Sequence, residues 1–247
     1  MMLLELDGVN SHYGESHILR DVSMQVSEGE ICALLGRNGA GKTTTLRSIA
    51  GASPPDVRTG SVRFQDEDIT GGNPEDVAAR GISFVPEERR VFTELTVAEN
   101  LKLPEVAQNA SNRWGRSAAT TDTGLSLDDV FEYFPRLEER QSQAAGTLSG
   151  GEQQMLAIGR ALRQPTELLL LDEPYEGLAP QIIKSVENAI ERIRDDGQTI
   201  LLVEQNARAA MNIADRCYVV DQGEVVFAGG ADELADDEET RQRYLGV

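Results

Sequence analysis

The 247-residue sequence predicts an α/β fold built around a mixed β-sheet. Short apolar or alternating runs typical of strands are spread along the chain, helical patterns lie between them, and a glycine-rich loop joins one strand directly to a helix. Apolar residues make up 40% of the chain and charged residues 26%, so the chain can form a sizeable core. We expect this core to carry an N-terminal antiparallel β portion and an inserted helical subdomain.

The first third of the chain predicts short strands separated by turns. A compact apolar strand at 30–35 is followed at once by the glycine-rich loop at 36–41, and residues 43–50 have a helical pattern. The other strands expected here cover residues 3–9, 22–26, 60–64 and 81–85. A strand, a glycine-rich loop and a helix in direct succession indicate a site for phosphate groups.

After Pro86 the pattern becomes mostly helical. Residues 108–126 are polar, lack periodicity and predict a surface loop, whereas residues 127–140 are helical in pattern with an interruption at Pro135. Two capping boxes predict helix starts, one at Thr96 with Glu99 and one at Ser149 with Glu152. We place the helical subdomain at about 88–160 and the core at 1–87 and 161–247.

The last part of the chain returns to an α/β pattern. Residues 168–171 and 199–203 are uninterrupted apolar runs, as expected of strands covered on both faces. Residues 182–194 predict an amphipathic helix, and the stretch 218–228 predicts a hairpin around an Asp-Gln-Gly turn. The charged tail at 232–243 is predicted to be helical.

The charge balance limits the classes of partner. The chain has 42 acidic and 23 basic residues and a net charge of −19, so a grip on nucleic acid through its phosphates is not expected. Only three of the basic residues are lysines, and this acidic, lysine-poor composition resembles proteins from a high-salt cytoplasm.

The remaining composition points to a cytoplasmic protein. Cys32 and Cys217 are far apart in the sequence within apolar runs, so we expect buried free thiols and neither a disulfide nor a cysteine metal site. No stretch resembles an export signal or a membrane span. His12 and His17 are the only histidines, which excludes a mechanism that needs a histidine later in the chain.

The glycine-rich loop fits the phosphate-binding P-loop pattern completely. Its glycines let backbone N–H groups surround a β-phosphate, Lys42 can reach the β- and γ-phosphates, and the Thr43 hydroxyl can ligate Mg²⁺. The residues expected to bind nucleotide here are Gly36, Arg37, Asn38, Gly39, Ala40, Gly41, Lys42, Thr43 and Thr44. The motif predicts binding of ATP with Mg²⁺.

Two acidic residues follow the apolar strand at 168–171. Asp172 emerges at the carboxyl end of this strand, where it can hold the Mg²⁺ shell beside the P-loop. Glu173 comes next and is placed to polarise an attacking water molecule. We therefore predict Asp172 as a metal ligand and Glu173 as a catalytic carboxylate.

A helix start at 149–152 supplies the third motif. Physically, a helix N-terminus with a free serine hydroxyl and two glycines is an anion site. The order of the three motifs resembles that of the ATP-binding-cassette ATPases, over essentially the whole chain as a single domain. The resemblance implies that Ser149, Gly150, Gly151 and Glu152 close over the γ-phosphate of a nucleotide held by a second ATPase subunit. Two sites would then lie at a dimer interface.

The same resemblance assigns further residues. Tyr13 matches the aromatic residue that stacks on adenine in this family. Glu87 stands where the family usually has a glutamine that senses Mg²⁺, and a carboxylate can still ligate the metal. Gln205 stands where the family usually has a histidine that senses the γ-phosphate. Ala179 replaces a usual aspartate, which puts that contact across the dimer in doubt.

These departures together resemble one subfamily, the second ATPase subunit of branched-chain amino acid importers. Its partners would be a related ATPase or a second copy, two transmembrane permeases and an extracellular solute-binding protein, with the chain on the inner face of the membrane. Three alternatives stay open: a urea or other amino-acid importer, a lipid exporter cassette, and a non-transport ATPase such as an iron–sulfur assembly subunit. A repair ATPase of the split type is disfavoured because residues 88–160 contain no long coiled coil.

Overall fold

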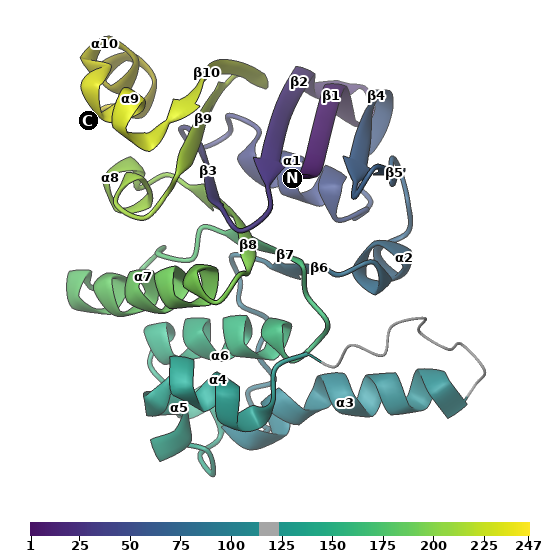
Figure 1. Cartoon of the computed structure of the whole chain (residues 1–247), viewed down its shortest axis with the longest axis vertical. Helices are drawn as coiled ribbons and strands as arrows, with labels where there is room; N and C mark the ends of the chain where they lie inside the picture. Colours follow the sequence, from purple (N-terminus) through teal and green to yellow (C-terminus); the bar gives the residue numbers. More distant parts are fainter. Residues whose placement is uncertain (114–123) are drawn as a thin grey trace.

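The computed structural model describes residues 1–113 and 124–247, which form two β-sheets with helices between and beside them (Figure 1). The first sheet is antiparallel, with the order β2-β1-β4-β5. Its strands are β1 (Met2–Tyr13), β2 (Ser16–Ser27), β4 (Asp56–Phe64) and β5 (Glu67–Asp68). This sheet is the predicted N-terminal antiparallel portion, and β1 and β2 are longer than the sequence pattern indicated.

The second sheet is mixed, with the order β10-β9-β3-β8-β7-β6. Five of its strands are parallel, and β10 pairs antiparallel with β9. They are β3 (Ile31–Leu35), β6 (Ile82–Val85), β7 (Leu168–Asp172), β8 (Thr199–Glu204), β9 (Arg216–Asp221) and β10 (Glu224–Gly230). Every residue of β3, β7 and β8 is buried, as their apolar runs predicted. The α/β class with a mixed sheet is confirmed.

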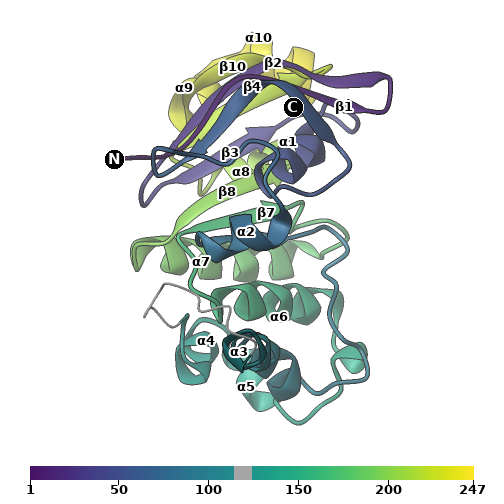
Figure 2. The ribbon, with the colours of Figure 1, turned by 90° about the vertical axis from the view of Figure 1, so that its right-hand side faces the viewer.

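Helix α1 (Lys42–Ile49) lies between the two sheets, as Figure 2 shows. It contacts β2 and β4 of the first sheet and β7 and β8 of the second. Its buried Leu46 and Ile49 join a core cluster shared by both sheets, which also contains Phe64. The P-loop therefore opens into a helix that is fixed on both sides. The short helix α2 (Pro74–Ala79) packs against β6.

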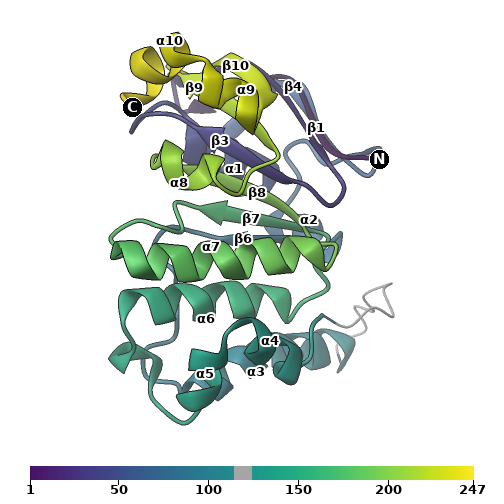
Figure 3. The same cartoon turned by 60° about the vertical axis from the view of Figure 1, so that its left-hand side comes forward.

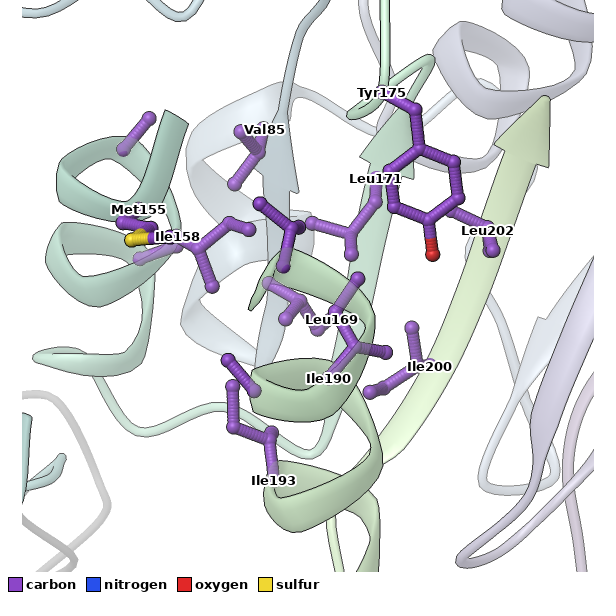
Figure 4. Packing of buried hydrophobic residues seen from close by; sticks show 14 of the residues in the cluster. Val85, Met155, Ile158, Leu169, Leu171, Tyr175, Ile190, Ile193, Ile200 and Leu202 are labelled. Carbon is purple, nitrogen blue, oxygen red and sulfur yellow. The ribbon is translucent and has the colours of Figure 1, made fainter. Parts of the chain in front are cut away.

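The opposite face of the mixed sheet is covered by α6 (Gly150–Leu162), α7 (Pro180–Asp195) and α8 (Ala207–Met211) (Figure 3). Figure 4 shows how Met155 and Ile158 of α6, and Ile190 and Ile193 of α7, pack towards the leucines of β7 and β8. The period of these apolar residues predicted a buried helix face in each case. This second cluster fixes the strand ends that carry Asp172 and Glu204.

Helices gather at one end of the molecule, furthest from the antiparallel sheet (Figure 1). They are α3 (Val97–Arg113), α4 (Leu127–Tyr133), α5 (Pro135–Glu139) and a 3₁₀ turn at Ala145–Thr147, and α6 packs against α3. The predicted boundaries at 88 and 160 stay a proposal.

The surface loop expected at 108–126 was wrong in its first part, because α3 continues to Arg113. This last part of the helix is polar in sequence and has no apolar stripe, so it gave no periodic signal. Ser126 then caps α4 through a capping box. The rest of the expected loop, at 114–123, lies outside the described residues.

Local signals at a helix start, at a hairpin and in the tail agree with the structure. The Thr96 hydroxyl accepts from the Glu99 N–H at 3.2 Å, and the Glu99 carboxylate accepts from the Thr96 N–H at 2.8 Å. The β9–β10 hairpin turns through Gln222 and Gly223, whose φ angles are +49° and +85°. The tail forms α9 (Ala231–Asp236), α10 (Glu238–Thr240) and a π-helical turn at Arg241–Leu245.

Both cysteines are buried and free, as expected. They lie on adjacent strands, with Cys217 opposite Ala33 in the β3–β9 register, and their side chains belong to different core clusters. Within the described residues, no helix combines the length and the hydropathy needed to cross a membrane.

Candidate functional site

The glycine-rich loop turns tightly between β3 and α1 because side chains are excluded at key points. A Cβ atom at Gly36 would lie 2.4 Å from the Val220 carbonyl oxygen. Gly41, the residue before α1, has a φ of +116°, and a Cβ there would lie 2.9 Å from Leu19. Only glycine combines this backbone conformation with this close packing. The loop backbone can therefore approach a phosphate closely at the start of the helix.

Lys42 lies under this loop with only 4% of its side chain exposed. Its Nζ is 3.1 Å from Oε1 of Glu173 and donates to the Arg37 carbonyl oxygen at 3.3 Å. The P-loop cation and the predicted catalytic carboxylate are therefore direct neighbours. A phosphate group bound by Lys42 would lie beside Glu173.

Thr43 and Asp172 meet at the first turn of α1. The Thr43 hydroxyl donates to Oδ1 of Asp172 at 3.1 Å, and Asp172 is almost fully buried at the end of β7. Burial raises the pKa of Asp172 to about 6, and the charge of Glu173 adds to this, while the Thr43 hydrogen bond and Lys42 oppose it. A buried carboxylate next to a hydroxyl is a set of hard oxygen donors, which suits Mg²⁺.

Glu87 and Glu176 form a hydrogen-bonded carboxyl pair at the same site. A hydrogen bond from one carboxyl to the other, together with burial and the charges of Glu176, Glu173 and Asp172, raises the pKa of Glu87 to about 7. Two carboxyl groups this close share a proton, since both cannot be charged without repulsion. A divalent cation would relieve that repulsion, which fits the predicted role of Glu87 as a ligand.

Lys42, Thr43, Glu87, Glu173 and Glu176 line one cavity of about 440 Å³, and Asp172 reaches it through Thr43. It is lined by Tyr13, Ile18, Asn38, Gly39, Gly41, Lys42, Thr43, Thr44, Glu87, Glu173 and Glu176. The structure thus brings together the predicted adenine-stacking residue, the P-loop and two of the predicted acids. Gly36, Arg37 and Ala40 complete the loop behind it. Among the described residues, neither Gln205 nor the 149–152 motif lines this cavity.

The 149–152 motif begins α6 at some remove from the chain's own cavity. Ser149 is exposed, but the expectation of a free hydroxyl was wrong: it donates to Oε2 of Glu152 at 2.8 Å and accepts from the Glu152 N–H at 3.3 Å. The Ser149 N–H donates to Oε2 of Glu152 at 2.9 Å, which closes the capping box in both directions, and Arg140 pairs with Oε1 of Glu152 at 2.8 Å. Gly151 is required by packing, since a Cβ would lie 2.1 Å from Ile182.

Gln205 is exposed and follows β8 directly, one residue after the buried Glu204. Three residues near the site were not singled out from the sequence: Ile18 and Glu176, which line the cavity, and Glu204, which contacts the loop after Glu173. Glu176 and Glu204 lie close in sequence to Ala179 and Gln205, which carry the resemblance to the subfamily, but they were given no role, and an isolated apolar residue such as Ile18 carries no signal.

Comparison with known proteins agrees with this geometry. Residues 19–176 match the family described as ABC transporter. The chain belongs to the ABC transporter family, as an ATP-binding cassette. It is 45% identical to the high-affinity branched-chain amino acid transport ATP-binding protein BraG of Pseudomonas aeruginosa, over 99% of this chain and 100% of that protein.

Two other relatives extend across the whole cassette. The probable branched-chain amino acid transport ATP-binding protein LivF of Archaeoglobus fulgidus is 37% identical over 97% of each chain. The lipopolysaccharide export system ATP-binding protein LptB of Escherichia coli is 32% identical over 100% of this chain and 98% of that protein. A solved ATP-binding cassette in its ADP conformation aligns with a TM-score of 0.80 and 26% identity, over 97% of this chain and 96% of that one. This cassette therefore binds nucleotide and hydrolyses ATP.

Proposed function

We propose that this cassette powers an ABC importer for branched-chain amino acids. The convergence of Tyr13, the P-loop, Glu87 and Glu173 on one cavity carries the ATPase part of this proposal. The cargo class rests on the similarity to BraG and LivF and on the residues Glu87, Ala179 and Gln205 in the three slots where the subfamily departs from other cassettes.

The cavity supports a specific division of work. Tyr13 stacks on adenine, the backbone of the P-loop binds the phosphates, and Lys42 holds the γ-phosphate next to Glu173. Thr43, Asp172 and Glu87 supply the oxygen ligands for Mg²⁺, which when bound offsets phosphate charge. Glu173 accepts a hydrogen bond from the attacking water and takes its proton, since its carboxylate is the one placed beside Lys42.

The cassette acts as a dimer, with a related ATPase or a second copy. The motif of Ser149, Gly150, Gly151 and Glu152, in which Ser149 is exposed, binds the γ-phosphate held by the other subunit, because this motif does not line its own subunit's cavity. ATP binding closes the dimer and hydrolysis reopens it, which is a shift of populations driven by the nucleotide.

Two transmembrane permeases dock on the helical end of the cassette, and a solute-binding protein completes the system outside the cell. The cassette therefore works on the inner face of the membrane. Nucleic acid is not a partner. A groove of about 290 Å³ beside the mixed sheet supports this placement. It is lined by residues of β6 and of the turn after it, by Leu103 and Pro104 of α3, and by Arg160 of α6. Phe92 lies in this groove with 54% of its side chain exposed.

The catalytic roles are tested by substitutions at two residues, Glu173 and Gln205. Glu173→Gln keeps ATP affinity, lowers turnover by roughly 10²–10⁴, as loss of a general base does, and accumulates an ATP-bound dimer. Gln205→Ala lowers turnover by about tenfold, because its amide can hydrogen-bond but cannot accept a proton at neutral pH. Gln205→His, which restores the family's usual residue, is tolerated.

Steady-state ATPase assays measure the loss of turnover, and size-exclusion chromatography measures the ATP-bound dimer. The partner ATPase is added if the homodimer shows no activity. Wild-type turnover in Glu173→Gln together with its loss in Gln205→Ala would reverse these assignments.

The cargo is tested by uptake of labelled leucine in a strain that lacks this cassette. We expect uptake to fall in that strain and to return with the wild-type chain but not with Glu173→Gln. Uptake of labelled urea in the same strains distinguishes a urea importer from an importer of branched-chain amino acids. The LptB similarity favours a lipid exporter as the second candidate, and normal leucine uptake with lipid retained in the inner membrane would support it. Normal export and uptake would favour a non-transport ATPase.

A further inference from the structure

Two loops meet at the carboxyl end of the mixed sheet, and one buried side chain joins them. The first loop follows β7 and begins with Glu173, and the second follows β8 and begins with Gln205. Glu204, the last residue of β8, is 2% exposed. Its Oε1 accepts from the Tyr175 N–H at 2.9 Å, and its Oε2 accepts from the Asn206 N–H at 3.1 Å. Each carboxylate oxygen therefore holds one loop.

The first of these loops contains a strained residue. Glu173 has a φ of +45°, in the left-handed region that a residue other than glycine adopts only when its surroundings hold it there. Two hydrogen bonds tie this turn to the end of β8: the Glu173 N–H donates to the Val203 carbonyl at 2.9 Å, and the Tyr175 N–H donates to Glu204. The placement of the Glu173 carboxylate thus depends on Glu204.

Packing alone does not explain a glutamate at this position. Burial raises the pKa of Glu204 to about 7, against the effect of backbone N–H groups of Tyr175, Asn206 and Gln205. Within residues 1–113 and 124–247, no lysine, arginine or histidine forms an ion pair with it. A buried carboxyl group without a cation costs stability that an apolar residue would not. The hydrogen bonds from the two loops to its carboxylate account for a glutamate at this position.

We propose that Glu204 is a positioning residue that couples the loop of Glu173 to the loop of Gln205, so that the general base and the γ-phosphate sensor adopt their working positions together. This inference rests on the roles given to Glu173 and Gln205 in the proposed function. Glu204 touches neither substrate nor metal, and it acts through the backbone of the residues that flank the two side chains.

Steady-state ATPase of the full chain with Mg²⁺ and ATP tests this coupling, with the partner ATPase present if needed. Glu204→Gln keeps one acceptor oxygen, but its amide NH₂ is a donor that faces one of the two backbone N–H donors. We expect kcat to fall by about tenfold or more, as for loss of a hydrogen bond to a charged group, with KM for ATP changed by no more than about twofold. Glu204→Asp keeps the charge and recovers part of the loss. The matched control is Glu187→Gln, because Glu187 is also buried but pairs with Lys184 on α7.

A double-mutant cycle separates positioning from a general effect on structure. Because Glu204 acts partly through Gln205, the loss of kcat in Glu204→Gln with Gln205→Ala should be smaller than the product of the single losses. Wild-type kcat in Glu204→Gln, an equal loss in Glu187→Gln, or losses that multiply would each overturn the proposal. If thermal melting shows that Glu204→Gln is unfolded, Glu204→Asp carries the same cycle. These measurements need no cargo, so a wrong importer assignment would appear in leucine uptake and not here.

Discussion

Lys42 supplies the positive charge at the phosphate end of the cavity, where it is the one lysine or arginine among the described lining residues. Lys42→Ala should weaken ATP binding by roughly 1.5–3 kcal/mol for each charge-assisted hydrogen bond to phosphate that it removes. It also removes the partner of Glu173, which adds repulsion towards the phosphates. Titration with a fluorescent ATP analogue measures the change, and Lys184→Ala, an exposed lysine on α7, is the control. Equal affinities in both variants would contradict the P-loop assignment.

Glu204 also predicts a dependence of stability on pH. Burial raises its pKa from 4.5 to about 7 in the folded chain, so the folded state binds this proton more tightly than the unfolded state. The stability gained from binding this proton is complete below pH 4.5 and is lost as the pH rises through 7 and the carboxyl group becomes charged. The free energy of unfolding of the wild type, relative to Glu204→Gln, should fall by roughly 3 kcal/mol across that range. Urea unfolding at several pH values measures it, and a constant difference between the two proteins would contradict it.

The site residues that could be predicted from sequence are those that lie within continuous sequence motifs. The P-loop and the Asp172–Glu173 pair sit in continuous motifs beside a strand, so their spacing alone indicated a shared site. In the structure, Glu173 and the P-loop line one cavity, and Asp172 bonds to Thr43 of that loop. Glu176 and Glu204 contribute through contacts with Glu87 and Tyr175, which are distant in sequence. Such contacts depend on which strands are neighbours in the sheet and on where each of them ends. A single sequence does not reveal this arrangement.

At the scale of elements, the turn between β6 and α3 links the cavity to the groove beside the mixed sheet where we propose that a permease docks. Arg89 donates to Oε1 of Gln154 in α6 at 3.1 Å and to the Glu176 carbonyl at 2.9 Å. Arg160 of α6 holds the Arg90 carbonyl at 2.8 Å and lies 5.5 Å from the Phe92 ring centre. A displacement of the turn therefore reaches both α6 and the loop after Glu173.

Substitution in this turn should uncouple transport from ATP binding. Phe92→Ala removes an exposed side chain from the groove, so we expect leucine uptake to fall by about tenfold while ATP affinity stays unchanged, since a central aromatic contact contributes this much to an interface. Arg89→Ala and Arg90→Ala should act in the same direction. Val226→Ala, an exposed apolar residue on β10, is the control. Crosslinks that place the permease against residues 232–247 would contradict the proposed docking face.

Element predictions succeeded where burial and periodicity agree. The fully buried β3, β7 and β8 and the one-sided α6 and α7 each have an apolar pattern that matches their surroundings. The end of α3 has no such pattern, and the strands of the antiparallel sheet extend beyond their alternating centres because pairing with β1 continues past them. Backbone pairing with a distant strand leaves no mark on the local sequence.

At the scale of the whole molecule, the net charge of −19 predicts how stability depends on salt. Like charges repel across the folded surface, and salt reduces the range of that repulsion from ~10 Å at 0.1 M to ~3 Å at 1 M. The melting temperature and the ATPase rate should therefore both rise from low to molar KCl. Sucrose of equal osmolarity is the control, because it strengthens burial without screening charge. A melting temperature that stays flat or falls with KCl would reject the high-salt interpretation, whereas the ATPase assignment depends on the cavity and would stand.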